Sequence, residues 1–294
     1  MNADQREAAE TWVEYGERTP RKPRMASSVV LLKDSSAGLK TYLTYRPGGS
    51  PLGTVAFPGG TIEVADDDVT DWVGPSATAW AKSLGTDDIG LAKRHVVAAI
   101  RELFEETGIL LAGTDASSVI EGISGPEWMR ARESIAAQES TFASLLERYG
   151  LGLRTDLLKP LSHWISPEFA HRRFDTRYFA ATPPVNQEPT LLTSKGVWGR
   201  WACASEILAQ RSNSALGDEI GLPNTTALTL GELVVPGVEI ILEKIAAARG
   251  CIAYLNHKRP ISEYQPRLIV GDDGGFTLEV ATAPASEGGL CRER

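Results

Sequence analysis

The chain has 294 residues, of which 42% are hydrophobic and 23% charged, proportions typical of a globular protein with a sizeable core. Its net charge of −8 provides no general attraction to nucleic acid or to an anionic membrane, so a polyanionic ligand would need a local basic patch or a bound cation. Three isolated cysteines, a polar N-terminus unlike a signal peptide, and no run of about 18 apolar residues predict a cytoplasmic protein without disulfides, zinc or membrane spans.

The N-terminal part of the chain predicts an arm followed by strands. Residues 1–24 read as a short polar helix and a basic, proline-broken stretch, which we expect to lie outside the core. Residues 25–33 and 40–47 alternate apolar and polar positions around a small turn, and they predict a β-hairpin. Residues 53–60 predict another short strand that ends in a Pro-Gly-Gly turn. The main domain is expected to run over residues 25–210.

An acidic insertion precedes the clearest helix of the sequence. Residues 67–90 are rich in acidic and turn residues and predict a surface insertion that holds a short helix. From about Leu91 to Thr107, apolar residues recur at helical spacing, and Gly108 stands where a left-handed cap commonly ends a helix. We therefore expect the insertion to join the helix near Leu91 without interrupting it.

The rest of the chain predicts further helices and strands. Within the main domain, residues 112–158 predict a helical insertion, and residues 161–167 and 172–184 predict two strands. Residues 211–280 predict a C-terminal extension with several helices and two late strands. Residues 281–294 are small and polar, and we expect a disordered tail there.

Three glutamates crowd one turn near the end of the predicted helix. Glu102, Glu105 and Glu106 stand at positions i, i+3 and i+4, so they share one face, opposite the apolar residues. A solvated acidic face is the simplest interpretation, but like charges at these spacings cost about 0.2–0.5 kcal/mol per pair. Carboxylates in the last turn also oppose the helix dipole, by about 0.3–1 kcal/mol. A divalent cation would remove both costs, and hard oxygen ligands favour Mg²⁺ or Mn²⁺.

The residues around these glutamates resemble the Nudix box, Gly-x5-Glu-x7-Arg-Glu-U-x-Glu-Glu-x-Gly-U, where U is a large apolar residue. Residues 101–109, RELFEETGI, match every fixed position of its second half, and FPGG lies upstream. Asp66 stands in place of the first glutamate, and residues 67–100 replace the usual seven-residue spacer. An interrupted box of this kind is similar to the large Nudix proteins typified by the peroxisomal coenzyme A diphosphatases.

The resemblance implies a fold and an activity. The fold would be an α/β/α sandwich with a mixed sheet, helical insertions and a C-terminal helical extension. The activity would be Mg²⁺- or Mn²⁺-dependent hydrolysis of the diphosphate linkage in a nucleoside diphosphate derivative, with coenzyme A or acyl-coenzyme A as the first subclass. Hydrolysis of ADP-ribose or dinucleotides is one alternative, and a non-catalytic nucleotide-binding module is another. The expected partner is a small nucleotide-type molecule, without nucleic acid or membrane.

Within the box, the resemblance implies a role for each polar side chain. Glu102, Glu105 and Glu106 would be the metal-binding carboxylates. Glu102 or Glu105 would also orient or deprotonate the attacking water, and Arg101 would orient the glutamates through a salt bridge.

Outside this helix, four residues are candidates for substrate binding, each with a simpler alternative. Arg46 would hold a phosphate, or is a surface arginine. Gly59 and Gly60 would let the backbone approach the diphosphate, or form a tight turn. Glu188 would supply a further carboxylate, or is an ordinary loop acid. Lys195 stands near where related sequences often carry an acid, which bears on the number of metal ions or on the substrate.

Two further expectations concern structure. In the stretch RRFDT, Arg173 and Asp175 are expected to form a structural ion pair. Residues 234–248 predict a helix that is apolar on more than one side and needs a covering surface. We expect a homodimer to provide that surface, with folding onto the chain's own sandwich as the alternative.

Overall fold

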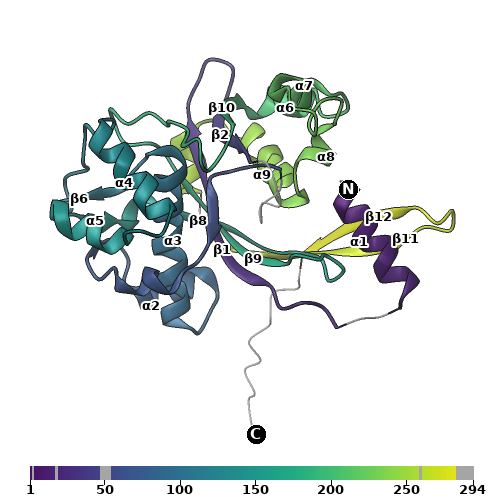
Figure 1. Ribbon diagram of the computed structural model, residues 1–294, viewed down its shortest axis with the longest axis horizontal. Coiled ribbons are helices and arrows are strands. Elements are labelled where there is room, and N and C mark those ends of the chain that lie inside the picture. The colour runs from purple at the N-terminus through teal and green to yellow at the C-terminus, as the bar shows by residue number, and fades with distance from the viewer. Residues whose placement is uncertain (2, 17–18, 47–53, 258–259, 283–294) are drawn as a thin grey trace, which may run out of the picture.

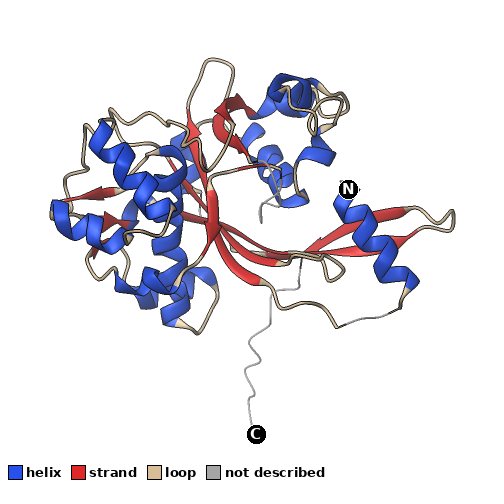
Figure 2. Ribbon diagram, in the orientation of Figure 1, coloured by secondary structure: helices blue, strands red, loops and turns tan. Residues whose placement is uncertain are grey.

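A mixed β-sheet between two groups of helices forms the body of the protein (Figure 1). The computed structural model describes residues 1, 3–16, 19–46, 54–257 and 260–282. The helices between residues 64 and 157 cover one face of the sheet, and those between residues 204 and 256 cover the other (Figure 2). The predicted α/β/α sandwich is therefore confirmed.

The main sheet has nine strands, and its central path runs in the order β10-β2-β1-β9-β8-β11-β12. Two short strands lie off this path, because β3 pairs with β2 and β4 pairs with β1. The β1–β9 and β8–β11 pairs are parallel and the other pairs antiparallel, so the sheet is mixed. The strands are β1 (Arg24–Lys33), β2 (Lys40–Tyr45), β3 (Val55–Ala56), β4 (Gly59–Thr61), β8 (Lys159–Ile165), β9 (Phe174–Ala181), β10 (Trp198–Cys203), β11 (Glu263–Val270) and β12 (Phe276–Thr282).

The central strand β1 is apolar on both faces because helices cover both. Val29 and Leu31 belong to one hydrophobic core, and Val30 and Leu32 belong to the other. A continuous apolar run is the pattern expected of a strand that is buried on both sides. The predicted hairpin with β2 is confirmed, with Leu32 opposite Thr41.

One core lies between the sheet and the helices that span residues 64 to 157. Its elements are η1 (Val64–Asp68), α2 (Ala77–Leu84), α3 (Ile89–Thr107), α4 (Pro126–Ala136), α5 (Phe142–Tyr149) and η2 (Thr155–Leu157). A small sheet in the order β5-β7-β6 accompanies them, formed by β5 (Trp72–Val73), β7 (Gly152–Arg154) and β6 (Ala112–Gly113).

The acidic insertion packs as part of this core. Trp80 of α2 is only 2% exposed and meets Phe179 of β9 edge to face, with 5.9 Å between ring centroids. The next helix, α3, begins at Ile89, where the Asp88 carboxylate accepts a hydrogen bond from the Leu91 amide at 2.8 Å. Asp88 is therefore an N-cap, and α3 continues without interruption to Thr107.

The second core covers the opposite face of the sheet. Its helices are α6 (Ala204–Ala209), α7 (Ala215–Ile220), α8 (Leu230–Leu233), α9 (Pro236–Ala246) and α10 (Cys251–Asn256). The apolar residues of α9, including Val238 and Ile241, are buried within the same chain, and Gly237 lies against the Trp164 ring of β8. This helix is therefore covered by its own sandwich, and its apolar character gives no support for a dimer contact. The homodimer itself stays a prediction.

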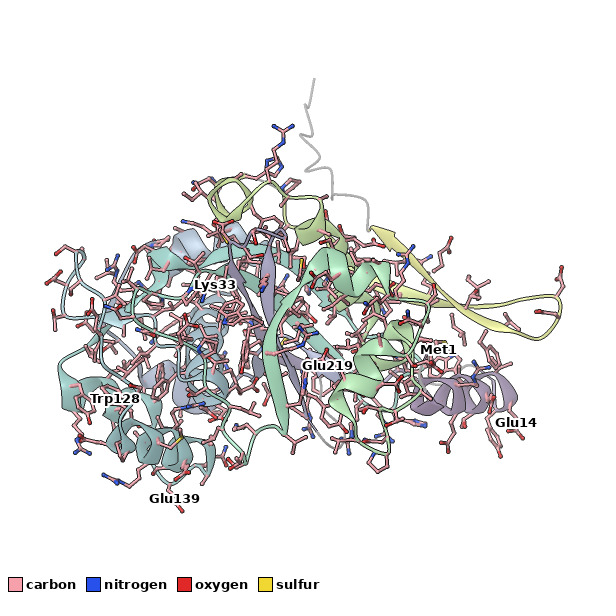
Figure 3. The ribbon with its side chains drawn as sticks, turned by 90° about the horizontal axis from the view of Figure 1, so that it is seen from above. Met1, Glu14, Lys33, Trp128, Glu139 and Glu219 are labelled. Atoms are coloured by element: carbon pink, nitrogen blue, oxygen red, sulfur yellow. The ribbon has the colours of Figure 1, made fainter. Side chains whose placement is uncertain are left out.

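The N-terminal helix packs against the C-terminal hairpin formed by β11 and β12. Helix α1 (Ala3–Glu14) packs Ala8 and Ala9 in a third cluster with Phe169 and with apolar residues of the hairpin. Figure 3 shows this helix, between the labels Met1 and Glu14, beside the hairpin. Residues 281 and 282 of the predicted tail belong to β12, which ends at Thr282, and residues 283–294 lie outside the described part. None of the described helices is long and apolar enough to cross a membrane.

Candidate active site

The three glutamates lie in the last two turns of α3, and all three are buried. Helix α3 ends at Gly108, whose φ of 75° forms the left-handed cap that the sequence predicts. Glu102 is 5% exposed, Glu105 2% and Glu106 1%. The simple interpretation of a solvated acidic face is therefore excluded. Burying three carboxylates costs free energy unless each is paired, so the partners of each carboxylate show what the site is built for.

Arg101 is the central partner of the acidic residues. Its Nη1 donates to Glu102 Oε1 at 3.0 Å and to Glu105 Oε1 at 2.8 Å. Its Nε donates to Asp66 Oδ1 at 2.8 Å, and its Nη2 donates to the Thr61 carbonyl oxygen at 2.9 Å. Asp66, which replaces the usual glutamate of the motif, thus contacts the same guanidinium as two of the three glutamates. Arg101 is 3% exposed, so these are buried, charge-assisted contacts.

Two further cations come from segments that are distant in sequence. Arg46, directly after β2, makes an ion pair with Glu106 Oε1. Lys195, in the loop between β9 and β10, places Nζ 2.7 Å from Glu105 Oε2. Arg46 thus contacts a glutamate of the box directly, although its alternative assignment was a surface arginine.

The Pro-Gly-Gly turn brings β4 against both β1 and α3. The Gly59 amide donates to Glu106 Oε2 at 3.3 Å. A Cβ at Gly59 would overlap the Ser27 carbonyl oxygen and Ser28, and a Cβ at Gly60 would overlap the Glu102 carboxylate. Both positions therefore need glycine for close approach, to the sheet in one case and to the glutamates in the other.

Arg132 of α4 was not identified from the sequence, although it closes the end of α3. It is 2% exposed, and burial lowers the pKa of its guanidinium to about 10. Its Nη2 donates to the carbonyl oxygens of Glu105 at 3.1 Å and Thr190 at 2.8 Å. The Thr190 amide in turn donates to the Thr107 carbonyl oxygen at 2.7 Å, which fixes the loop that carries Lys195. Nothing in the sequence around Arg132 indicates that its side chain would bind these main-chain carbonyl oxygens.

The acidic side chains around the three glutamates outnumber the cationic ones. Five acidic side chains, those of Glu63, Asp66, Glu102, Glu105 and Glu106, face four cations. Arg46, Arg101 and Lys195 pair directly with these carboxylates, and Arg132 acts on Glu105 and Glu106 from a greater distance. Burial raises the pKa of the Glu106 carboxyl to about 8, although Arg46 acts in the opposite direction. Burial also raises the pKa of Glu102, against the opposing charge of Arg101. Additional positive charge would favour the ionised form of both groups.

The donor set fits a hard divalent cation in its chemistry. Glu102, Glu105 and Glu106 supply carboxylate oxygens, and Glu106 Oε1 accepts no hydrogen bond from any described residue. Its contact with Arg46 is an ion pair that lacks hydrogen-bond geometry. Among the residues that the structure describes, no group of three or more acidic, histidine or cysteine side chains is placed to hold a metal ion in this conformation. The glutamates turn toward cationic side chains instead, so some of these contacts would have to be exchanged on metal binding.

Glu188 lies apart from this set of contacts. Its carboxylate pairs with Lys33 Nζ at 2.7 Å, and the glutamate side chain is 66% exposed. The structure thus gives it the environment of an ordinary loop acid, and no contact with the three glutamates is seen among the described residues.

The predicted ion pair between Arg173 and Asp175 is wrong. The Arg173 guanidinium donates to the carbonyl oxygens of Ser166 and Arg21 instead. Asp175 of β9 pairs with His163 Nε2 on the neighbouring strand β8, at 2.6 Å. Asp175 lies directly opposite Ile165, and His163 is its diagonal neighbour two positions along β8. Diagonal neighbours on one face of an antiparallel pair lie within reach of each other's longer side chains, so Asp175 finds its partner across the sheet.

Comparison with known proteins identifies the fold. No family model matches the sequence, and no curated protein matches it. The structure is similar to that of a Nudix hydrolase from Alicyclobacillus acidocaldarius, with a TM-score of 0.62 and 20% identity over 81% of this chain and 98% of that one. A MutT Nudix hydrolase from Burkholderia pseudomallei also matches, at 13% identity and a TM-score of 0.36, over 76% and 99% of the two chains. The similarity to the Alicyclobacillus acidocaldarius structure shows that the chain has the Nudix fold.

Proposed function

We propose that the protein is a Mg²⁺- or Mn²⁺-dependent hydrolase that cleaves the diphosphate linkage of a nucleoside diphosphate derivative. The observation that carries this proposal is the buried set of Glu102, Glu105 and Glu106 at the end of α3, deficient in positive charge and flanked by Arg46 and Lys195. Buried carboxylates with a purely structural role would be expected to have enough cationic partners to neutralise them, whereas these glutamates do not.

The three glutamates would hold the metal, and the remaining residues of the cluster would position them. A bound Mg²⁺ or Mn²⁺ supplies charge neutralisation at the phosphoryl oxygens and a water of lowered pKa. Glu102 or Glu105 would orient or deprotonate the attacking water, and the raised pKa of Glu102 suits a proton acceptor. Arg101 and Asp66 would keep the glutamates in place through their shared contacts.

The substrate would enter from the side of Arg46 and Lys195. A diphosphate carries the negative charge that these two cations could neutralise once a metal ion compensates the glutamates. Coenzyme A or an acyl-coenzyme A is the first class to test, because the interrupted box and the large chain are similar to that branch of the superfamily. ADP-ribose and dinucleotides are the enzymatic alternatives.

A direct assay would test the proposal. The purified protein, with Mg²⁺ or Mn²⁺, would be incubated with coenzyme A, an acyl-coenzyme A, ADP-ribose and a dinucleotide polyphosphate, and the products separated by chromatography. Cleavage within the diphosphate of at least one compound, abolished by Glu105→Gln, is the expected result. Binding of a nucleotide by calorimetry without any cleavage would instead favour the non-catalytic module.

A further inference from the structure

Lys195 contacts Glu105 from a loop that backbone hydrogen bonds hold on both sides of the lysine. The Lys195 and Gly196 amides donate to the Leu192 carbonyl oxygen at 2.9 and 3.1 Å, which forms a turn. The Val197 amide donates to the carbonyl oxygen of Tyr45, the residue before Arg46, at 3.2 Å. The turn is therefore docked on the end of β2, and Lys195 and Arg46 reach the glutamates from neighbouring positions.

The two oxygens of Glu105 are both occupied by cations. Oε1 accepts from Arg101 at 2.8 Å, and Oε2 lies 2.7 Å from Lys195 Nζ. A divalent cation coordinated by Glu105 needs at least one of these oxygens, and an ammonium group at the same oxygen would repel it. Because the two positive charges repel each other, metal binding should weaken at least one of the two contacts.

Of these two cations, Lys195 is the one that can move. Its side chain is 27% exposed, whereas that of Arg101 is 4% exposed and also bound to Asp66 and Thr61. Lysine has a flexible four-carbon stem and a single charged nitrogen, so the ammonium can change partners while the backbone stays in place.

We infer that Lys195 is a built-in counter-ion of Glu105 that competes with the divalent cation and then transfers its charge to the diphosphate of the substrate. In the metal-free protein, the ammonium neutralises a buried carboxylate that would otherwise lack a second partner. Coordination of a divalent cation by Glu105 would free the ammonium, which lies beside Arg46, to contact a phosphate group. The first half of this inference concerns metal binding alone, and the second half rests on the proposed function.

Two measurable consequences follow from this competition. Replacing Lys195 by an uncharged residue removes a competitor, so divalent cations should bind more tightly in the absence of substrate. The same replacement removes a ligand of the diphosphate, so a diphosphate should bind more weakly once the metal is present. A lysine that only stabilises the fold would weaken both interactions or neither.

The test is a titration of Mn²⁺ followed by electron paramagnetic resonance, on wild type, Lys195→Gln, Lys195→Arg and the control Lys33→Gln. Lys33 also pairs with a glutamate at 2.7 Å, so its replacement matches the change in net charge away from the site. We expect Lys195→Gln to bind Mn²⁺ about tenfold more tightly than wild type, and the control to bind as wild type does. Lys195→Arg keeps the positive charge, so its affinity should stay within a few-fold of wild type.

The second arm uses methylenediphosphonate, which cannot be hydrolysed, at saturating Mn²⁺, with binding followed by calorimetry. We expect Lys195→Gln to bind this probe about tenfold more weakly, and Lys33→Gln to bind it as wild type does. Unchanged or weaker Mn²⁺ binding by Lys195→Gln, no measurable Mn²⁺ binding by any of the proteins, or equal binding of the diphosphonate would overturn the inference. Neither binding measurement requires turnover. Absence of hydrolysis in the substrate panel would therefore count against the proposed function, whereas the Mn²⁺ and diphosphonate affinities would still test the role of Lys195.

Discussion

Arg132 of α4 donates from Nη2 to the carbonyl oxygen of Glu105 in α3 at 3.1 Å, and from Nε to the same oxygen at 3.3 Å. A side chain of the helical insertion therefore holds the main chain of the residue whose carboxylate lies at the centre of the candidate site. The same guanidinium binds Thr190 in the loop that leads to Lys195. One buried cation thus sets the distance between the helix and the loop.

Replacement of Arg132 should affect both stability and activity. Arg132→Gln would leave the Glu105 and Thr190 carbonyl oxygens without their charged donor, which should lower the free energy of unfolding by about 3 kcal/mol. Urea denaturation measures this loss, and the turnover number should fall as the loop shifts. Arg130→Gln, on the exposed side of the same helix, is the matched control and should stay within about 0.5 kcal/mol of wild type. Equal stability of the two variants would show that Arg132 does not fasten the loop.

The glutamates themselves should be needed for turnover more than for folding. Glu105→Gln and Glu106→Gln should each reduce turnover by at least about 100-fold, as expected when a charge-stabilising group is lost. Thermal stability should be unchanged or slightly higher for Glu106→Gln, because burial already raises the pKa of that carboxyl to about 8. Glu105→Gln should lower it, because Arg101 and Lys195 lose their shared buried partner. Glu147→Gln, an exposed glutamate of α5, serves as control. Full activity in both site variants would remove the basis of the proposed function.

Gly60 should be intolerant of any side chain. In Gly60→Ala the new methyl group would overlap the Glu102 carboxylate, so either that carboxylate or β4 must shift. We expect a loss of activity of about 100-fold and a destabilisation of about 1–3 kcal/mol, measured by steady-state kinetics and chemical denaturation. Gly231→Ala, in α8 with open space around it, should keep full activity. A fully active Gly60→Ala protein would contradict the close approach.

A buried histidine should make the fold sensitive to acid. Burial, together with the nearby Arg177, lowers the pKa of His95 to about 3, and its Nδ1 lies 3.0 Å from the Ser27 hydroxyl. Because the folded pKa is below the unfolded value of about 6.5, stability is complete above pH 6.5 and falls as the pH drops toward 3. His95 should therefore lower the free energy of unfolding by about 2 kcal/mol between pH 7 and pH 5.

Thermal denaturation from pH 7 to pH 5 measures this dependence. His95→Gln should flatten it, whereas His171→Gln, which replaces an exposed histidine, should leave it unchanged. The same slope in wild type and His95→Gln would assign the acid sensitivity to other groups.

Local patterns in the sequence were sufficient to predict the helix that carries the site. The helical period, the three glutamates and the cap at Gly108 are features of consecutive residues, and α3 has the predicted extent and end. The strands of the hairpin were predicted for the same reason, since alternation is visible within each segment.

The partners of the glutamates could not be predicted in this way. Lys195 and Glu105 are 90 positions apart and meet only because the loop after β9 folds over the end of α3. Arg132 was overlooked because its role depends on carbonyl groups, which every residue possesses. The pair expected between Arg173 and Asp175 was inferred from closeness in sequence, whereas Asp175 has its partner on the adjacent strand.

The packing of α1 on the β11–β12 hairpin determines where the chain can be shortened. A truncation that starts at residue 25, the first residue of the main domain as the sequence predicts it, would strip Ala8 and Ala9 from the surface formed by Leu268, Phe276 and Leu278. Beyond Tyr264, where pairing with β8 ends, the hairpin continues as two strands, and such a ribbon with a bare apolar face is marginally stable and prone to self-association. An expression vector that omits the N-terminal helix should therefore yield aggregated protein, even though every residue of the glutamate cluster would still be encoded.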